Sequence, residues 1–251
     1  MPLLEVSDLR RSFGGVAAVD GASFTVEGGA LTGLIGPNGA GKSTVVGLIA
    51  GSVRATGGRI AFRGQPITNR SEMERSRLGI TRTYQLSSEF ARLTVMDNLL
   101  VGPKHQPGEV LVGAMMGRHH WGRIEDANIV KARSLLSRFG MADAENAYAG
   151  ELSGGQKRLV EIMRALMSDP QLLLLDEPMA GVNPVRILEI ESVLTALRRE
   201  GVTMLLVEHE LDTVERLCDA VIVMARGRVV ATGGMADLRS RGEVVDAYLV
   251  G

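Results

Sequence analysis

The chain has 251 residues, of which 45% are hydrophobic and 23% charged, and its formal net charge is −1. This length suits one large α/β domain or a core with a small subdomain. The near-neutral charge and the aromatic content of 4% give no case for a nucleic-acid partner. No apolar run approaches the ~20 residues that a membrane-spanning helix needs. The first residues lack a signal-peptide pattern, and the single Cys218 suits a reducing compartment.

Alternating apolar and polar residues predict a small antiparallel sheet in the first quarter of the chain. Its expected strands are Leu4–Leu9, Ala22–Val26 and Gly58–Gly64, and Phe13 is expected in the turn after the first of them. The apolar run Leu31–Ile35 predicts another strand, which is buried and leads into a glycine-rich loop.

This loop matches the pattern G-x-x-x-x-G-K-[ST] and is followed by an apolar run that predicts a helix over Thr44–Ala50. The matching residues are Gly36, Pro37, Asn38, Gly39, Ala40, Gly41, Lys42, Ser43 and Thr44. A strand, a glycine-rich loop and a helix form the context of a phosphate-binding loop, whose backbone N–H groups bind anions. Lys42 is expected to reach the β- and γ-phosphates and Ser43 to hold Mg²⁺. The segment therefore predicts a nucleoside triphosphate site.

Periodicity and capping residues predict the elements of the middle of the chain. These are a solvent-exposed helical turn over 69–77, a strand over Leu78–Gln85, a helix over Thr94–Val101, an irregular segment over 102–122 and an amphipathic helix over Ile124–Phe139 that Gly140 caps. The adjacent His119 and His120 lack a third ligand at suitable spacing, so they are a weak metal signal.

A second potential anion site is formed by Ser153, Gly154, Gly155 and Gln156. Ser153 and Gln156 have the spacing of a capping box at the start of a helix. By itself such a segment is also compatible with an ordinary loop. Since one triphosphate needs only one cradle, the second would serve a nucleotide bound to another copy of the chain.

The last third of the chain alternates buried apolar runs with helices, which predicts a parallel sheet covered on both faces. The expected strands are Leu172–Glu177, Thr203–His209 and Ala220–Met224, and the expected helices are Pro184–Glu200 and Glu210–Leu217. Asp176 and Glu177 end one strand, where Asp176 would hold the metal and Glu177 would polarise a water. The pair also suits a helix N-cap before Pro178, but the upstream phosphate loop favours the catalytic interpretation.

These motifs occur in the order and spacing of ATPases of the ABC type, which the whole chain resembles. Several details resemble the ATP-binding subunits of importers for branched-chain (hydrophobic) amino acids, with their urea and amide relatives: Arg11–Gly15, Thr81–Gln85, Leu93–Leu99, Leu152–Gln156, Ala180–Pro184, Val207–Leu211 and Ala247–Leu249. The resemblance implies an α/β P-loop fold with a mixed, largely parallel sheet core, an antiparallel β subdomain and a helical insert. The core would comprise 1–85 and 152–251, and the insert about 86–151.

The resemblance also implies roles for single residues. Phe13 would stack on adenine, although a lone Phe in a turn more often packs in a core. Gln85 would contact Mg²⁺ and the attacking water and sense a transmembrane partner. Residues Ser153 to Gln156 would contact the γ-phosphate that the opposite subunit holds. His209 would bind the γ-phosphate and fix Glu177.

The implied function is that of an ATPase subunit, with ATP and Mg²⁺ as ligands, at the cytoplasmic face of a membrane. Two such subunits, alike or different, would sandwich two ATP molecules and drive separate permease subunits. A solute-binding protein would deliver the solute to these permeases. Asn183 stands where many ABC proteins have aspartate, but this importer branch itself resembles Asn-Pro there. Retained activity with altered communication between the two sites is therefore expected. Branched-chain or other hydrophobic amino acids are the first expectation for the solute. Urea or short amides, a soluble nucleotide switch and an exporter's ATPase are the alternatives.

Overall fold

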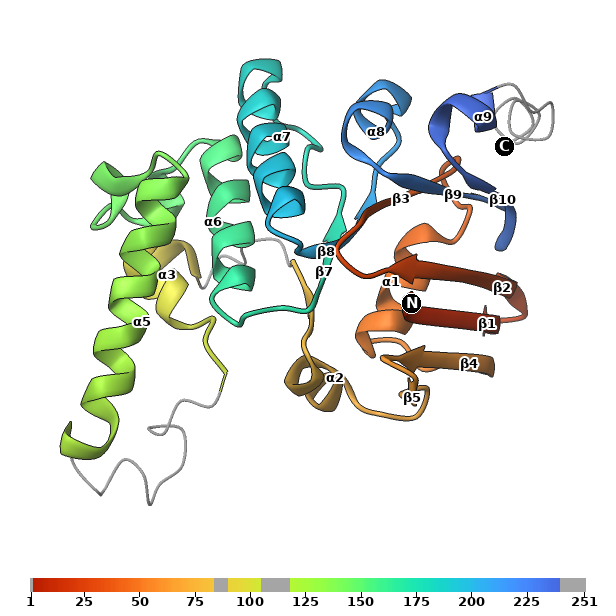
Figure 1. Cartoon of the computed structure of the whole chain (residues 1–251), viewed down its shortest axis with the longest axis horizontal. Helices are drawn as coiled ribbons and strands as arrows, with labels where there is room; N and C mark the ends of the chain where they lie inside the picture. The colour runs from red at the N-terminus through yellow and green to blue at the C-terminus, as the bar shows by residue number, and fades with distance from the viewer. Residues whose placement is uncertain (1, 84–89, 105–117, 240–251) are drawn as a thin grey trace. The chain divides into compact units, whose positions relative to one another are not determined.

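The computed structural model describes residues 2–83, 90–104 and 118–239 (Figure 1). The chain divides into two compact units. The first comprises Met1–Arg82, Gln171–Ala180 and Glu191–Gly251, and the second comprises Thr83–Pro170 and Gly181–Ile190. The second unit includes the helix after Ser153, which the sequence-based division assigned to the core. That division into a core and a helical insert remains a proposal.

The first unit contains two sheets, and its elements are β1 (Pro2–Phe13), β2 (Val16–Glu27), β3 (Leu31–Ile35), α1 (Lys42–Ala50), β4 (Gly57–Phe62), β5 (Gln65–Pro66), α2 (Glu72–Leu78), β6 (Ile80–Arg82), β7 (Leu172–Asp176), β8 (Thr203–Val207), α8 (Leu211–Leu217), β9 (Ala220–Ala225), β10 (Arg228–Gly233) and α9 (Met235–Arg239). Those of the second unit are η1 (Phe90–Arg92), α3 (Val95–Leu100), α5 (Arg118–Arg138), η3 (Ala142–Ala144), η4 (Ala149–Glu151) and α6 (Gly154–Leu166). Helix α7 (Pro184–Arg199) begins in the second unit and ends in the first.

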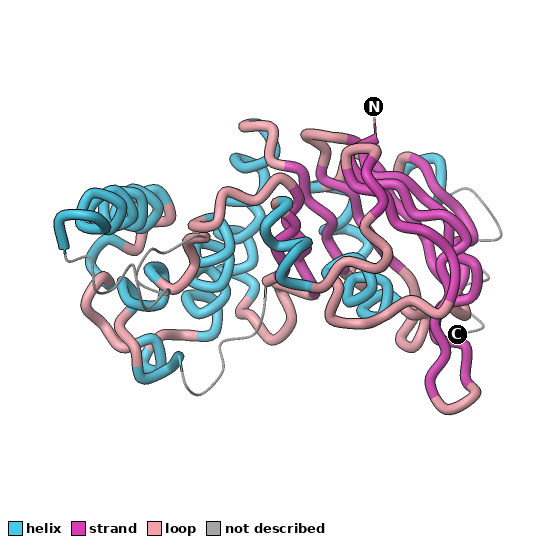
Figure 2. The backbone as a smooth tube through the Cα atoms, turned by 90° about the horizontal axis from the view of Figure 1, so that it is seen from below, coloured by secondary structure: helices cyan, strands magenta, loops and turns pink. Residues whose placement is uncertain are grey.

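The larger sheet has the strand order β10-β9-β3-β8-β7-β6, and the smaller one has the order β2-β1-β4-β5. Figure 2 shows the strands in magenta and the helices in cyan. Strands β9, β3, β8, β7 and β6 pair in parallel, whereas β10 pairs with β9 in the antiparallel direction. The smaller sheet is antiparallel throughout. The expected mixed sheet and antiparallel β subdomain are therefore present.

The parallel strands are apolar on both faces because both faces are covered. In β9, Ile222 and Met224 join the cluster that includes α1, while Val221 and Val223 join the cluster with α8 and α9. Successive side chains of a strand point to opposite faces, so an uninterrupted apolar run can fill two cores.

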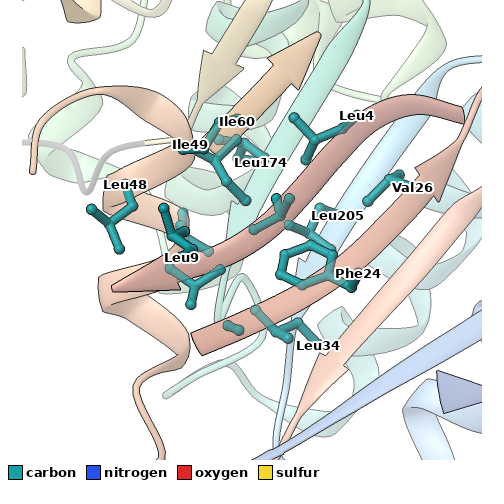
Figure 3. Packing of buried hydrophobic residues seen from close by; sticks show 14 of the residues in the cluster. Leu4, Leu9, Phe24, Val26, Leu34, Leu48, Ile49, Ile60, Leu174 and Leu205 are labelled. Atoms are coloured by element: carbon teal, nitrogen blue, oxygen red, sulfur yellow. The ribbon is translucent and has the colours of Figure 1, made fainter. Parts of the chain in front are cut away.

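Helix α1 is buried between the two sheets. Leu48 and Ile49 of the helix lie in one cluster with Phe24 of β2 and with Leu174 and Leu205 of the parallel sheet (Figure 3). These side chains are at most 6% exposed. Burial of side chains of this size contributes about 1.5–3 kcal/mol each, so packing determines where the N-terminus of α1 lies.

The segment 69–77 forms α2 as expected, but its charged residues are not all solvated. Ser71 and Glu74 form a capping box at its start. Arg75 is only 2% exposed, and its guanidinium donates to the carbonyls of Leu48 and Ile49. These carbonyls belong to the last turn of α1, where a basic group also complements the helix dipole. A side chain from α2 therefore caps the helix that begins at the phosphate-binding loop.

Several element boundaries differ from the sequence-based prediction. Strand β6 is shorter than predicted because Leu78 ends α2, and Gly79 reverses the chain with φ 107°. Phe13 ends β1, and the turn is Gly14–Gly15. Helix α5 begins at Arg118, so the end of the segment expected to be irregular is helical. Cys218 directly follows α8, and burial raises the pKa of its thiol to about 12.

Strand β10 and helix α9 were not predicted. Arg226 and Gly227 have φ values of 48° and 78°, which form the tight turn between β9 and β10. A two-residue turn with positive φ at both positions suits a hairpin, and the glycine between two apolar runs is the signal for it. No helix in the described parts of the chain has the length and apolar character needed to cross a membrane.

The contacts of Arg75 lead to a stability prediction. Arg75→Ala leaves buried carbonyls at the end of α1 without a donor, so we expect the free energy of unfolding to fall by about 3 kcal/mol. Arg77→Ala is the matched control, because Arg77 is exposed on the same helix. Urea unfolding measures both, and equal small losses would contradict the capping role.

Candidate nucleotide site

The predicted phosphate-binding loop and two of the predicted catalytic residues meet at one edge of the larger sheet. Gly36 follows β3, Glu177 follows β7, and His209 comes shortly after β8. These three strands are neighbours and parallel, so their carboxyl ends lie at the same edge. Gly36, Pro37, Asn38, Glu177 and His209 line a hollow of about 300 Å³.

Two glycines of the loop are required by close backbone approach. Gly36 and Gly41 have φ values of 151° and 98°. A Cβ atom would lie 2.1 Å from the Met224 carbonyl oxygen at Gly36 and 2.3 Å from that of Ala18 at Gly41. Gly39 also has positive φ, 80°, but open space surrounds the corresponding Cβ position. The loop is therefore held against β9 at Gly36 and against β2 at Gly41, whereas open space lies beside Gly39.

Lys42 is oriented by the loop itself. Its Nζ donates to the carbonyls of Gly36 and Pro37 at 2.7 and 3.0 Å. The residue is only 5% exposed. Burial lowers the pKa of Lys42, and the charges of Glu177 and Asp176 partly oppose this effect. The ammonium is thus positioned within the loop, where an anionic ligand would stabilise its charge.

Asp176 connects three elements. Its Oδ1 accepts a 3.4 Å hydrogen bond from Ser43 Oγ at the start of α1. Its Oδ2 lies 2.7 Å from Nη2 of Arg82, the last residue of β6. Two of the residues predicted to hold a metal, Ser43 and Asp176, are therefore brought together, although they are far apart in sequence.

Glu177 has an unusual backbone conformation for a residue with a side chain. Its φ is 48°, a left-handed value that costs such residues about 1–2 kcal/mol. Its N–H donates to the Val207 carbonyl at 3.0 Å, and its carbonyl accepts from Ala180 N–H at 3.1 Å. These bonds hold the strained residue beside β8, and strain of this kind is typical of functional sites. No helix begins at Pro178, so the N-cap interpretation of the Asp176–Glu177 pair is wrong.

His209 is exposed, but the residue before it is deeply buried. The Glu208 carboxyl is 2% exposed, and its Oε1 accepts a 3.3 Å hydrogen bond from the N–H of Met179. Its Oε2 lies 3.8 Å from Nδ1 of His209. Burial raises the pKa of Glu208. This carboxyl therefore links the turn after Glu177 to the segment that carries His209.

Phe13 is partly exposed, with an exposed fraction of 46%. The guanidinium carbon of Arg11 lies 4.4 Å from the centre of its ring. Arg11 itself donates to the Arg54 carbonyl at 3.0 Å. The ring is thus outside the core and supported by a cation, as a stacking platform would require, but its expected contact with adenine stays a prediction.

The second predicted anion site lies at the N-terminus of α6 in the second unit. Ser153 caps this helix, and Gln156 Oε1 accepts from both its N–H and its Oγ. The capping box is therefore as expected. A Cβ at Gly155 would lie 2.8 Å from Cβ of Arg186, so glycine permits close approach to the start of α7.

Asn183 precedes α7 and has a structural role there. Its Oδ1 accepts a 3.0 Å hydrogen bond from Val185 N–H, and its carbonyl accepts from the N–H groups of Arg186 and Ile187. Asparagine is a favoured N-cap residue, so its side chain stabilises the start of the helix. Gln85 lies outside the described residues.

The donor set at Ser43 and Asp176 fits magnesium, because a hydroxyl and a carboxylate are hard oxygen ligands. Clusters of three or more His, Cys, Asp or Glu side chains able to hold a metal do not occur within the described residues. The described residues thus supply few ligands of their own, as in sites where substrate phosphates complete the coordination of magnesium.

Comparisons with known proteins identify the family of the chain. The ABC transporter family model matches residues 19–180. The chain belongs to the ABC transporter family. The cassette is 39% identical over 249 residues to the probable branched-chain amino acid transport ATP-binding protein LivG of Archaeoglobus fulgidus, covering 99% of this chain and 96% of the relative. It is 37% identical over 253 residues to the LivG protein of Methanocaldococcus jannaschii, described in the same words, covering 99% and 98%.

A solved ATP-binding cassette of an ABC transporter, in its ADP conformation, matches with a TM-score of 0.86 and 35% identity over 100% of both chains. The expected family and fold are therefore confirmed. The cassette binds ATP, and ATP hydrolysis coupled to transport is its activity.

Sequence reasoning missed three residues that touch the predicted site residues. Arg82 pairs with Asp176, Glu208 contacts the turn after Glu177, and Arg11 covers one face of the Phe13 ring. Only Glu208 carried a local signal, because a carboxylate directly after the five buried residues of β8 has little access to water.

The loop geometry predicts different losses of stability for two glycine substitutions. Gly41→Ala places a methyl group against the Ala18 carbonyl in addition to the cost of positive φ, so we expect a loss of at least about 3 kcal/mol in unfolding free energy. Gly39→Ala adds only the conformational cost, about 1–2 kcal/mol. Thermal and urea unfolding measure the difference, and equal losses would refute the close approach at Gly41.

Because Glu208 is buried, we expect Glu208→Gln to increase the stability of the fold by an amount that depends on pH. Because the folded chain raises the pKa of this carboxyl above its ordinary 4.5, the folded state favours the protonated form. The contribution of protonated Glu208 to the free energy of unfolding is fully present below pH 4.5. This contribution is lost as the pH rises through the higher folded-state pKa. The neutral amide escapes this loss, so the stability of the variant relative to wild type should increase from pH 4.5 to pH 8. Urea unfolding across that range tests this, and a constant difference would contradict it.

Proposed function

We propose that this cassette is the ATP-hydrolysing subunit of an importer for branched-chain or other hydrophobic amino acids. The observation that carries the mechanism is that Asp176, Glu177 and His209, at or after the ends of neighbouring strands, lie beside the phosphate-binding loop that contains Lys42. The names of relatives that match almost the whole chain support the class of solute.

In the proposed reaction, the backbone N–H groups of the loop and Lys42 bind the β- and γ-phosphates of ATP. Glu177 orients the attacking water and accepts its proton, and His209 binds the γ-phosphate beside it. Bound Mg²⁺, held by Ser43, Asp176 and Gln85, would neutralise charge that develops on the phosphates. The Phe13 ring stacks on the adenine, with Arg11 supporting its other face.

We further propose that the active form contains two cassettes, either two copies or this chain with a second ATPase. The support is the presence of a second cradle at the N-terminus of α6, where Ser153, Gly154, Gly155 and Gln156 can bind an anion. In the dimer these residues complete the site of the opposite cassette. Asn183 lies in the loop that crosses the dimer, and its cap on α7 keeps that loop ordered.

We base the remaining proposed partners on the family. Permease subunits supply the membrane path, and a solute-binding protein delivers the solute to them. The cassette would attach peripherally to the cytoplasmic side of the permeases. Urea or a short amide is the alternative solute, and the uptake assay below distinguishes it from leucine.

Glu177→Gln tests the proposed mechanism. The amide keeps the size of the side chain but cannot accept the proton, so we expect ATP turnover to fall by about 10²-fold or more. Nucleotide binding should persist and an ATP-bound dimer should accumulate, which size-exclusion chromatography with ATP can detect. Uptake of labelled leucine by a deletion strain should be restored by the wild-type chain and not by the variant.

The matched control is Glu5→Gln, which removes the charge of an exposed residue of β1 and should leave turnover and uptake unchanged. Wild-type turnover in Glu177→Gln would overturn the catalytic assignment. Restored uptake of urea without uptake of leucine would overturn the proposed solute and leave the ATPase mechanism intact.

A further inference from the structure

Arg82 lies within reach of Asp176 because of the register between β6 and β7. Arg82 is paired with Leu174, two residues before Asp176 on the neighbouring parallel strand. Side chains two residues apart on a strand share a face, so Arg82 and Asp176 lie on the same face of the sheet. The long arginine side chain extends along this diagonal to the end of β7.

The contact is close and partly shielded from water. Nη2 of Arg82 lies 2.7 Å from Oδ2 of Asp176, and the two side chains are 19% and 16% exposed. The other carboxylate oxygen, Oδ1, accepts from Ser43 Oγ. One oxygen therefore faces the phosphate-binding loop and the other carries a guanidinium.

We propose that Arg82 is a positioning residue that holds Asp176 before metal binds and competes with the divalent cation for this carboxylate. The inference rests on the proposed function, in which Asp176 helps to hold Mg²⁺. A guanidinium and a divalent cation repel each other and are attracted by the same carboxylate, and the low exposure of the pair limits screening by solvent. Arg82 thus keeps the carboxylate oriented toward Ser43 and lowers the affinity for metal.

The competing explanation is that Arg82 and Asp176 form a purely structural ion pair. The effect of Mg²⁺ on nucleotide affinity distinguishes the two explanations. The measured quantity is the ratio of the dissociation constants of a non-hydrolysable ATP analogue in EDTA and in Mg²⁺, obtained by titration calorimetry on the full chain. Arg82→Gln removes the competitor, so we expect this ratio to increase about tenfold, within the range usual for coupled binding. A structural pair would lower the melting temperature and leave the ratio unchanged, which would overturn the proposal, as would a smaller ratio.

Two further variants complete the experiment. Arg59→Gln makes the same change of net charge at an exposed residue of β4 and should keep the wild-type ratio. Asp176→Asn should bring the ratio close to one. If Asp176→Asn kept the wild-type ratio, the proposed metal role of Asp176 would fail. If Asp176→Asn lowered the ratio while Arg82→Gln kept the wild-type value, only the inference about Arg82 would fail.

A measurement on the wild-type chain covers the case in which Arg82→Gln does not fold. The side-chain Nε–H signal of Arg82, assigned by its loss in Arg82→Lys, can be followed by ¹⁵N NMR in the ADP complex. Adding Mg²⁺ should shift this signal, because the guanidinium loses its hold on Oδ2. An unchanged Arg82 signal at saturating Mg²⁺ would overturn the proposal.

Discussion

The burial of α1 between two sheets is the constraint on which the nucleotide site depends. The helix begins at Lys42, and its apolar residues lie in a cluster shared by the antiparallel and the parallel strands. Arg75 binds the carbonyls of its last turn. Packing along its length and capping at its end leave the helix little freedom, so its N-terminus faces the strand ends in a defined position. A phosphate-binding loop requires this arrangement, because its N–H groups bind anions only when they converge.

Charge at the site is balanced by groups from separate segments of the chain. Lys42 donates to two loop carbonyls, Asp176 pairs with Arg82, and Glu208 is buried beside the turn that follows Glu177. Each buried charge or carboxyl in the site thus has a partner, as burial in a low-dielectric environment demands. In the proposed mechanism, nucleotide and metal exchange the partners of Lys42 and Asp176.

Much of the site was predictable from short motifs. The glycine-rich loop, the capping box at Ser153 and the carboxylates after a buried strand are local patterns whose geometry follows from a few neighbouring residues.

The bulge in β1 shows where the alternation of apolar and polar residues fails within a strand. Asp8 has φ 48°, and the pairing with β2 shifts between Val6 and Leu9, so the apolar positions change from even to odd numbers.

The sequence by itself determined the family, the phosphate-binding loop and the alternation of buried strands with helices, because these depend on local periodicity and on motif spacing. Only the tertiary structure decided that Arg75 caps α1, that Arg82 pairs with Asp176 and that Glu208 is buried. The two arginine contacts join residues 26 to 94 positions apart. The burial of Glu208 depends on the residues that cover the end of β8. Strand register and helix packing bring such residues together, and neither is encoded in a short segment of chain.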